Sequence, residues 1–139
     1  MYLVDTSVWI DYFRNKQNKA VDFFCKVLDK KYPFGITSVI YQEMLQGVQT
    51  EQDFIKLSDY LITQRFYHPA DQVETYNEAA KIYFNCRKKG ITVRSTIDCL
   101  IAQISIENDL TLIHHDKDYE FIKAGATALK LWEADPALI

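Results

Sequence analysis

A short apolar strand that ends directly in a carboxylate constrains this fold more than any other feature. Residues 2–4 form an apolar run that is too brief for a buried helix and is typical of an interior strand covered on both faces. Asp5 follows at once, and Thr6 and Ser7 can cap a helix that begins after them. Because open α/β folds bind ligands at the carboxyl ends of their strands, this stretch predicts a carboxylate at such an edge.

The rest of the chain alternates short strands with helices. Apolar residues at three- and four-residue steps predict helices over residues 7–14, 19–30, 39–48, 50–63, 71–89, 95–108 and 116–123. Further strands are expected at residues 34–37, 110–114 and 129–132. This order predicts an α/β fold with a short central parallel sheet of roughly four to five strands, flanked by helices. The two consecutive helices between residues 39 and 63 predict a helical hairpin.

Helix ends and helix faces also follow from local residue types. Ser38 is expected to cap the helix at 39–48, and Gly90 to end the helix at 71–89 in a left-handed conformation. The inner face of that long helix is expected to carry Val73, Tyr76, Ala80, Tyr83 and Phe84.

Composition narrows the class of protein. The chain has 139 residues, 48% of them apolar, which predicts one folded domain over residues 1–139 and excludes a disordered chain. It has no long apolar run and no leader pattern, so we expect a soluble, cytoplasmic protein without a membrane segment. The three cysteines form no C-x-x-C pair and suggest neither a disulfide framework nor a zinc site. A net charge of −3 argues against a broadly basic nucleic-acid surface but permits a local basic path.

Four acidic residues are expected to meet at one end of the sheet. Asp5 ends the first strand, Glu43 lies on the helix after the second, Asp98 lies in the first turn of its helix, and Asp116 follows the strand at 110–114. Each also has a local explanation: Asp98 comes three residues after Ser95, as in a capping box, Asp116 can be an N-cap, and Glu43 can face solvent.

Four carboxylates in one crevice repel one another and need compensation. Hard divalent cations, Mg²⁺ or Mn²⁺, are the natural compensation for oxygen ligands. Zinc does not fit because no cluster of cysteines and histidines exists, and His114 and His115 would point to opposite faces of a continuing strand.

The sequence resembles a known family at these same positions. The stretches that carry the resemblance are VDTSVWIDYF, SVIYQEMLQG and STIDCLIAQISIENDLTLIHHDKDYEFI, and together they are similar to a PIN domain, in particular to VapC-type ribonuclease toxins of type II toxin–antitoxin modules. The resemblance implies one PIN-like domain and a metal-dependent endoribonuclease that hydrolyses RNA. It also implies a small VapB-like antitoxin as partner and, together with the many aromatic residues, a homodimer.

The resemblance assigns roles residue by residue. The catalytic positions fall on Asp5, Glu43, Asp98 and Asp116, and the supporting positions on Thr6, Ser7 and Asp118. Asp5 and Asp98 are the first choice for direct ligands of one or two Mg²⁺ or Mn²⁺ ions, with Asp116 as a further ligand. Asp118 can reach the ions only if Asp116 still lies in the turn before the last helix, because two helical residues at this spacing diverge by about 200°.

Basic residues near the acidic positions are candidate RNA contacts. They are Arg87, Lys88, Lys89, Arg94 and Lys117, although the first three also suit the negative end of a helix. A tRNA loop, an rRNA loop and mRNA are all compatible targets, and single-stranded RNA could also stack on exposed aromatic rings. Two alternatives stay open at this point: a receiver-like, Mg²⁺-binding phosphorylation switch, and a PIN-like module that binds RNA without cutting it. A dinucleotide or P-loop site is excluded because no glycine-rich motif is present.

Overall fold

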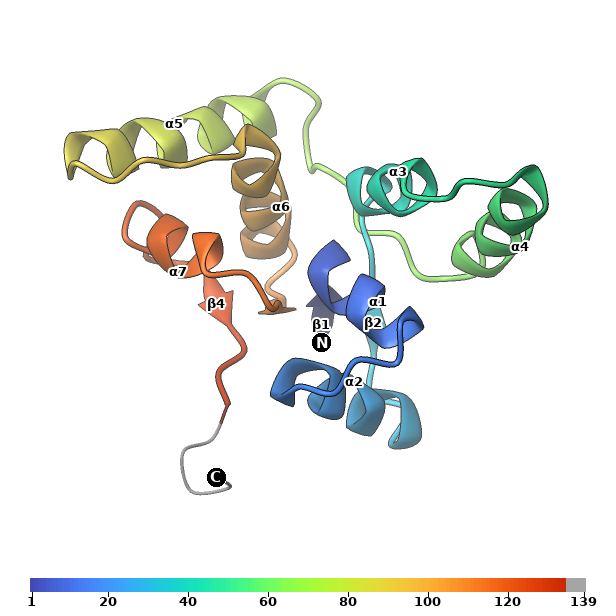
Figure 1. Cartoon of the computed structure of the whole chain (residues 1–139). Coiled ribbons are helices and arrows are strands. Elements are labelled where there is room, and N and C mark those ends of the chain that lie inside the picture. Colours follow the sequence, from blue (N-terminus) through green and yellow to red (C-terminus); the bar gives the residue numbers. More distant parts are fainter. Residues whose placement is uncertain (135–139) are drawn as a thin grey trace.

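The computed structural model describes residues 1–134 of the chain, and it has seven helices and four strands within them (Figure 1). The predicted order of elements is confirmed. The elements are β1 (Tyr2–Val4), α1 (Thr6–Phe13), α2 (Lys19–Asp29), β2 (Phe34–Gly35), α3 (Ser38–Gln46), α4 (Glu51–Leu61), α5 (Glu74–Lys88), α6 (Thr96–Glu107), β3 (Thr111–Ile113), α7 (Asp118–Lys123) and β4 (Lys130–Leu131).

The central sheet is parallel throughout and has the strand order β2-β1-β3-β4. β1 lies in the middle, with Leu3 opposite Gly35 on one side and Leu112 on the other. Leu3 and Leu112 are fully buried, as expected for a strand covered on both faces. The predicted α/β class is therefore confirmed, and the carboxyl ends of β1 and β3 meet at one edge.

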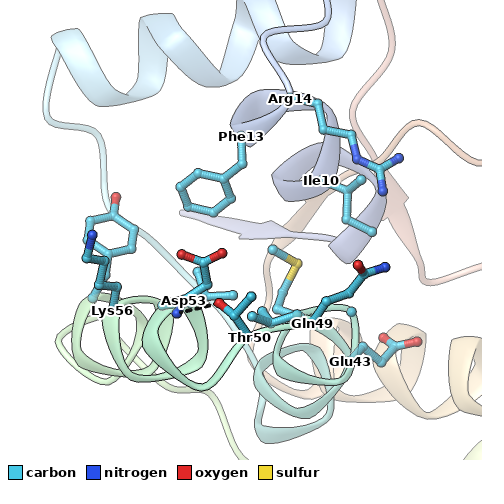
Figure 2. A pocket seen from close by; sticks show the side chains of 13 residues that line it. Ile10, Phe13, Arg14, Glu43, Gln49, Thr50, Asp53 and Lys56 are labelled. Carbon is cyan, nitrogen blue, oxygen red and sulfur yellow. Dashed lines mark hydrogen bonds between the residues drawn. The ribbon is translucent and has the colours of Figure 1, made fainter.

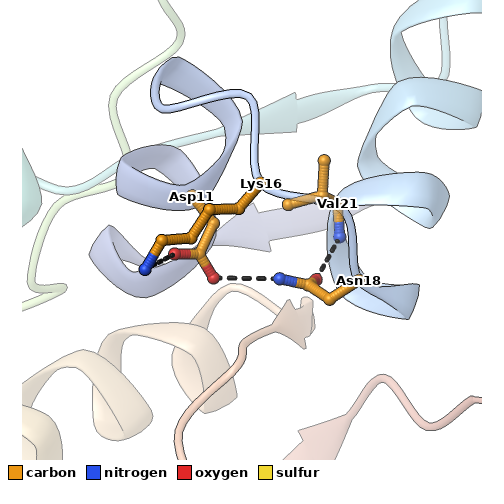
Figure 3. Close-up of polar contacts among 4 residues, drawn as sticks. All are labelled: Asp11, Lys16, Asn18 and Val21. Carbon is orange, nitrogen blue, oxygen red and sulfur yellow. Dashed lines mark hydrogen bonds and ion pairs between the residues drawn. The ribbon is translucent and has the colours of Figure 1, made fainter.

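Three groups of helices surround this sheet. α3 and α4 form the predicted hairpin on the right of Figure 1, while α5, α6 and α7 lie on its left. α1 and α2 are joined by a small polar cluster (Figure 3). There Asn18 Oδ1 accepts a hydrogen bond from the Val21 amide at 2.9 Å, Asn18 Nδ2 donates to Asp11 at 3.0 Å, and Lys16 lies 4.0 Å from the same carboxylate. Asn18 therefore caps α2 and fixes it against α1.

The predicted caps of two helices are wrong by one residue. Asp5, not Thr6 or Ser7, is the N-cap of α1, and its carboxylate accepts the Ser7 amide. Thr37, not Ser38, caps α3 by accepting the Ile40 amide at 3.1 Å. In both places a side-chain oxygen one position earlier reaches the first free amides of the helix. At α1 this leaves the two hydroxyls free to bind other groups.

The inner face of α5 also differs from the prediction. The helix begins at Glu74 rather than near residue 71, and its buried residues are Thr75, Ala79, Ile82 and Cys86. Val73, Tyr76 and Phe84 are instead 76%, 50% and 57% exposed. Apolar residues occur on both sides of this helix, so two phases of the helical period fit the sequence, and the structure buries the phase that was not predicted.

The predicted left-handed end of the long helix is confirmed. Gly90 has φ +75° directly after α5, which is the left-handed conformation that favours glycine. Cys25, Cys86 and Cys99 are all free thiols, and the last two are buried. None of the helices within residues 1–134 has the length and apolar character that a bilayer-spanning segment needs.

Candidate metal centre

Three carboxylates converge at the carboxyl edge of the sheet. Asp98, Asp116 and Asp118 each offer an oxygen, and these oxygens all lie within 4.8 Å of one another. Asp98 is in the first turn of α6, Asp116 is in the turn after β3, and Asp118 is the first residue of α7. Asp118 can thus reach a bound ion together with Asp116, because Asp116 lies in the turn before the helix. Its carboxylate accepts the Asp118 amide at 2.9 Å.

Asp5 lies beside this group and is held at both of its oxygens. Oδ2 accepts the Ser7 amide at 3.1 Å and the Ser7 hydroxyl at 2.7 Å, while Oδ1 accepts the Tyr119 hydroxyl at 2.7 Å. Asp5 is only 5% exposed. The same Tyr119 oxygen lies 3.4 Å from Oδ1 of Asp98, so one buried hydroxyl joins Asp5 to the three converging carboxylates.

Tyr119 is the site residue that sequence reasoning missed. Its ring is fully buried, and the pKa of its hydroxyl lies well above the usual value near 10. Burial is the main cause, and the charges of Asp5 and Asp98 act in the same direction. The hydroxyl therefore stays protonated and acts as a donor. Its position next to Asp118 is the signal in the sequence, but an acidic pattern does not single out a tyrosine.

The two predicted supporting hydroxyls contact carboxylates. Thr6 Oγ1 donates to Oε1 of Glu43 at 2.9 Å, which links α1 to α3. Ser7 Oγ donates to Asp5 and also accepts the His115 amide at 3.0 Å, so it joins the ends of β1 and β3. These contacts explain why hydroxyl residues suit the two positions after Asp5.

The acidic neighbours and burial raise the pKa values of two of the predicted carboxylates. The pKa of Asp98 is raised from 3.8 to about 7, chiefly by burial and then by the charges of Asp5, Asp116 and Glu43. Burial likewise raises the pKa of Glu43. The hydrogen bond from Thr6 lowers this pKa, and the charge of Asp5 raises it. The four residues therefore form one electrostatic unit.

The local explanation for Asp98 is not supported. Ser95 is the N-cap residue of α6 but makes no side-chain capping hydrogen bond, so the expected capping box is absent from this helix. The N-cap residue of α7 is Lys117 rather than Asp116. Asp116 lies one residue earlier and accepts the Asp118 amide, and its carboxylate lies close to that of Asp98.

Within residues 1–134 no lysine or arginine forms an ion pair with this acidic group. The ion pairs there join Lys16 to Asp11, Lys81 to Glu78 and Lys130 to Asp109, all elsewhere on the surface. The donor set consists of carboxylate oxygens, and within residues 1–134 no lysine or arginine neutralises its negative charge in an ion pair. Hard divalent cations such as Mg²⁺ and Mn²⁺ suit such a set.

The adjacent histidines do not extend the donor set. His114 is buried and its Nδ1 lies 2.9 Å from the backbone oxygen of Asp116, while His115 is exposed. Burial lowers the pKa of His114. The two rings thus differ in environment, as expected for successive residues after a strand.

The predicted basic residues fall into two groups. Arg87 lies over the Tyr83 ring at 5.1 Å, Lys88 over Phe84 at 5.6 Å, and Lys89 donates to the backbone oxygen of Ala124 at 2.5 Å. All three are thus engaged with the chain's own groups around the C-terminal end of α5.

Arg94 and Lys117 are closer to the carboxylates. Arg94 and Asp118 line one cavity of about 450 Å³, together with Gly90, Ile91, Thr92 and Phe121. Lys117 stands between Asp116 and Asp118 in the sequence and is exposed. Both cations therefore lie at the rim of the acidic group.

A larger groove of about 750 Å³ begins at Glu43 (Figure 2). Ile10, Phe13 and Arg14 line one side, and residues of the α3–α4 hairpin line the other, among them Thr50, Asp53 and Lys56. Its apolar lining also includes Met44, Leu57 and Tyr60. The groove therefore combines apolar side chains with charges of both signs. The candidate catalytic carboxylate of Glu43 lies at one end of it.

Comparison with known proteins agrees with this geometry. A family model for the PIN domain matches residues 2–126. Ribonuclease VapC11 of Mycobacterium tuberculosis and a VapC ribonuclease of Mycobacterium bovis are each 31% identical over 123 residues, which cover 88% of this chain and 91% of the relative.

Solved structures share the fold. VapBC2 from Rickettsia felis, bound to promoter DNA, matches with a TM-score of 0.72 at 16% identity, over 96% of this chain and 98% of that chain. FitAcB from Neisseria gonorrhoeae matches with a TM-score of 0.70 at 17% identity, over 96% and 97%. The chain therefore belongs to the PIN domain family.

Proposed function

We propose that this protein is a metal-dependent endoribonuclease and the toxin of a toxin–antitoxin module, with residues 1–139 as one nuclease domain. The observation that carries the proposal is the convergence of Asp98, Asp116 and Asp118, with Asp5 and Glu43 beside them, in a PIN domain. The relatives of this chain are ribonucleases by name, which supports RNA as the substrate class.

Carboxylate oxygens are the ligands proposed for the ion. Asp98 and Asp116 are favoured by their mutual approach, Asp5 by the predicted pattern, and Asp118 by its place in the converging group. A bound Mg²⁺ or Mn²⁺ supplies Lewis-acid stabilisation of the phosphodiester oxygens and lowers the pKa of water. Several carboxylates in one place favour such an ion because their charges repel one another, as the raised pKa of Asp98 shows.

The chain's own residues complete the reaction. Glu43, held by Thr6, is positioned to orient the attacking water and accept its proton, and its raised pKa makes it a better base than an exposed carboxylate. The water oxygen bonds to phosphorus, and the bond from phosphorus to the 3′ oxygen breaks. The products carry a 5′-phosphate and a 3′-hydroxyl.

We propose that RNA enters across the rim formed by Arg94 and Lys117. Arg94 shares a cavity with Asp118 and can contact phosphates next to the cleaved bond. Phe121 lines the same cavity and is 52% exposed, so a base of a single-stranded tRNA or rRNA loop can stack on it. Arg87, Lys88 and Lys89 are weaker candidates because each already contacts the chain's own groups.

The groove between α1 and the α3–α4 hairpin is the proposed seat of a VapB-like antitoxin tail. Similar solved structures are VapBC complexes, which supports a partner of this kind. An amphipathic peptide can lay apolar side chains on Phe13 and Tyr60, which are 43% and 41% exposed. An arginine at its end can pair with Glu43 and the carboxylates behind it.

A second apolar surface is the proposed homodimer interface. It contains Tyr76, Phe84 and Ile97 of α5 and α6, which are 50%, 57% and 41% exposed. Tyr76 and Ile97 line one apolar hollow between the two helices. Exposed aromatic and aliphatic groups of this kind are enriched at the centre of homodimer interfaces.

We propose that the nuclease acts in the cytoplasm, where its three free thiols stay reduced.

Cleavage of RNA in defined metal tests the proposal. Purified protein should cut RNA with Mg²⁺ or Mn²⁺ and stop cutting with EDTA. Asp5→Asn and Asp98→Asn should each lose at least about 100-fold in rate while they stay folded, because metal and electrostatic stabilisation is worth several kcal/mol. Binding of RNA by wild type without any cleavage in either metal would instead favour an RNA-binding module.

A further inference from the structure

We propose that Tyr119 is a positioning residue whose hydroxyl holds the Asp5 carboxylate in register with Asp98 and so preorganises the acidic group for a divalent cation. The inference rests on the proposed function, because it gives one more residue a task at the same site. It assigns the task to a side chain that no acidic pattern in the sequence would indicate.

The geometry of the hydroxyl carries the inference. Tyr119 is fully buried, and its oxygen lies 2.7 Å from Oδ1 of Asp5 and 3.4 Å from Oδ1 of Asp98. A phenol has one hydrogen to donate, so the shorter contact is the hydrogen bond and Asp98 is its second neighbour. One atom on α7 thereby fixes the spacing between the end of β1 and the first turn of α6.

Packing alone does not account for a tyrosine at this place. A phenylalanine would fill almost the same volume, and a buried hydroxyl costs free energy unless it finds a partner. Here both of its polar neighbours are carboxylates of the acidic group. The polar atom of Tyr119 therefore serves the site rather than the hydrophobic core.

Tyr119 and Ser7 act on opposite ends of the same carboxylate. Ser7 holds Oδ2 through its amide and its hydroxyl, while Tyr119 holds Oδ1. With both oxygens bound, the plane of the Asp5 carboxylate is fixed before an ion arrives. Residues that orient metal ligands in this way typically contribute about 10–100-fold in metal affinity.

Tyr119→Phe removes this oxygen and little else. Titration calorimetry of the metal-free protein should show Mn²⁺ affinity lowered by about 10-fold or more. Tyr67→Phe is the matched control: Tyr67 is also buried, but its hydroxyl contacts the Met1 sulfur at 3.7 Å. That variant should bind Mn²⁺ as wild type does. A Tyr119→Phe protein with a lower melting temperature but wild-type Mn²⁺ affinity would overturn the proposal, since the hydroxyl would then be structural only.

A double-mutant cycle tests whether the hydroxyl acts through Asp5. In an Asp5→Asn background the Asp5 carboxylate is absent, so adding Tyr119→Phe should change Mn²⁺ affinity less than twofold. A further loss of about 10-fold in that background would refute action through Asp5. Failure of wild type itself to bind Mn²⁺ or to cut RNA would count against the proposed function and is thus distinguishable from failure at Tyr119.

Discussion

Ionisation of Asp98 should make the metal-free protein less stable as the pH rises. Its pKa is 3.8 in an exposed carboxyl and about 7 in the folded protein, chiefly because of burial and then of the neighbouring charges. Between these values the unfolded chain releases the proton while the folded chain retains it. The stability linked to Asp98 is therefore complete below pH 4, declines as the pH rises through 7, and is lost above it.

The size of this effect follows from the two pKa values. A tenfold change in proton affinity is worth about 1.4 kcal/mol, so the rise from 3.8 to about 7 bounds the effect near 4 kcal/mol. Asp98 is only half-buried and water screens its neighbours, so we take about 2 kcal/mol. For a chain of this length that corresponds to a difference of about 6 °C in melting temperature.

Asp98→Asn isolates the contribution, because asparagine has a similar shape and no proton to release. In EDTA the variant should melt about 6 °C above wild type at pH 8 and within about 1 °C of it at pH 3.5, where the Asp98 carboxyl is mostly protonated in the unfolded chain as well. Asp59→Asn, an exposed change on α4, serves as the control and should follow wild type at both pH values. Mg²⁺ at pH 8 should stabilise wild type but not Asp98→Asn. Parallel melting curves for wild type and Asp98→Asn from pH 3.5 to pH 8 would refute the electrostatic reasoning.

Three further predictions concern the acidic residues at the start of α7, the homodimer and the antitoxin partner. Asp118→Asn should reduce cleavage less than Asp116→Asn, and an equal or greater loss at Asp118 would reverse that ranking. Light scattering at micromolar concentration should give about twice the 16.3 kDa chain mass, and Tyr76→Glu should give a monomer that still folds; a monomeric wild type would exclude the interface. Expression of the chain alone should arrest growth, and co-expression with the neighbouring small open reading frame should restore it. The Tyr60→Asp variant should remain toxic even when the small partner is co-expressed with it. Harmless expression of the wild-type chain alone would exclude the toxin function.

Much of the fold follows from periodicity because the central strands β1 and β3 are apolar and largely buried and the helices carry apolar residues on one face. The parallel sheet, the α3–α4 hairpin and the left-handed Gly90 all appear where the sequence predicts them. α5 is the exception: Tyr76 and Phe84 are apolar but exposed, and periodicity cannot tell a core face from a face kept for a partner.

The site was predictable to the extent that topology determines it. Carboxylates that follow parallel strands must meet at one edge, as Asp5 after β1 and Asp116 after β3 do. Asp98 and Asp118 join Asp116 there from the first turns of α6 and α7. The receiver-like alternative is no longer supported, since the chain belongs to the PIN domain family. Side-chain hydrogen bonds were beyond such reasoning: the caps at Asp5 and Thr37 and the hydroxyl of Tyr119 depend on distances that residue spacing does not contain.

The position of a bound ion tests the central claim most directly. Crystals grown with Mn²⁺ allow the ion to be located by its anomalous X-ray scattering, independently of any activity. The account predicts a Mn²⁺ peak in direct contact with the carboxylates of Asp98 and Asp116, and no peak there in Asp98→Asn. A protein that cuts RNA in Mn²⁺ but shows no ion at these carboxylates, or an ion bound elsewhere, would contradict it.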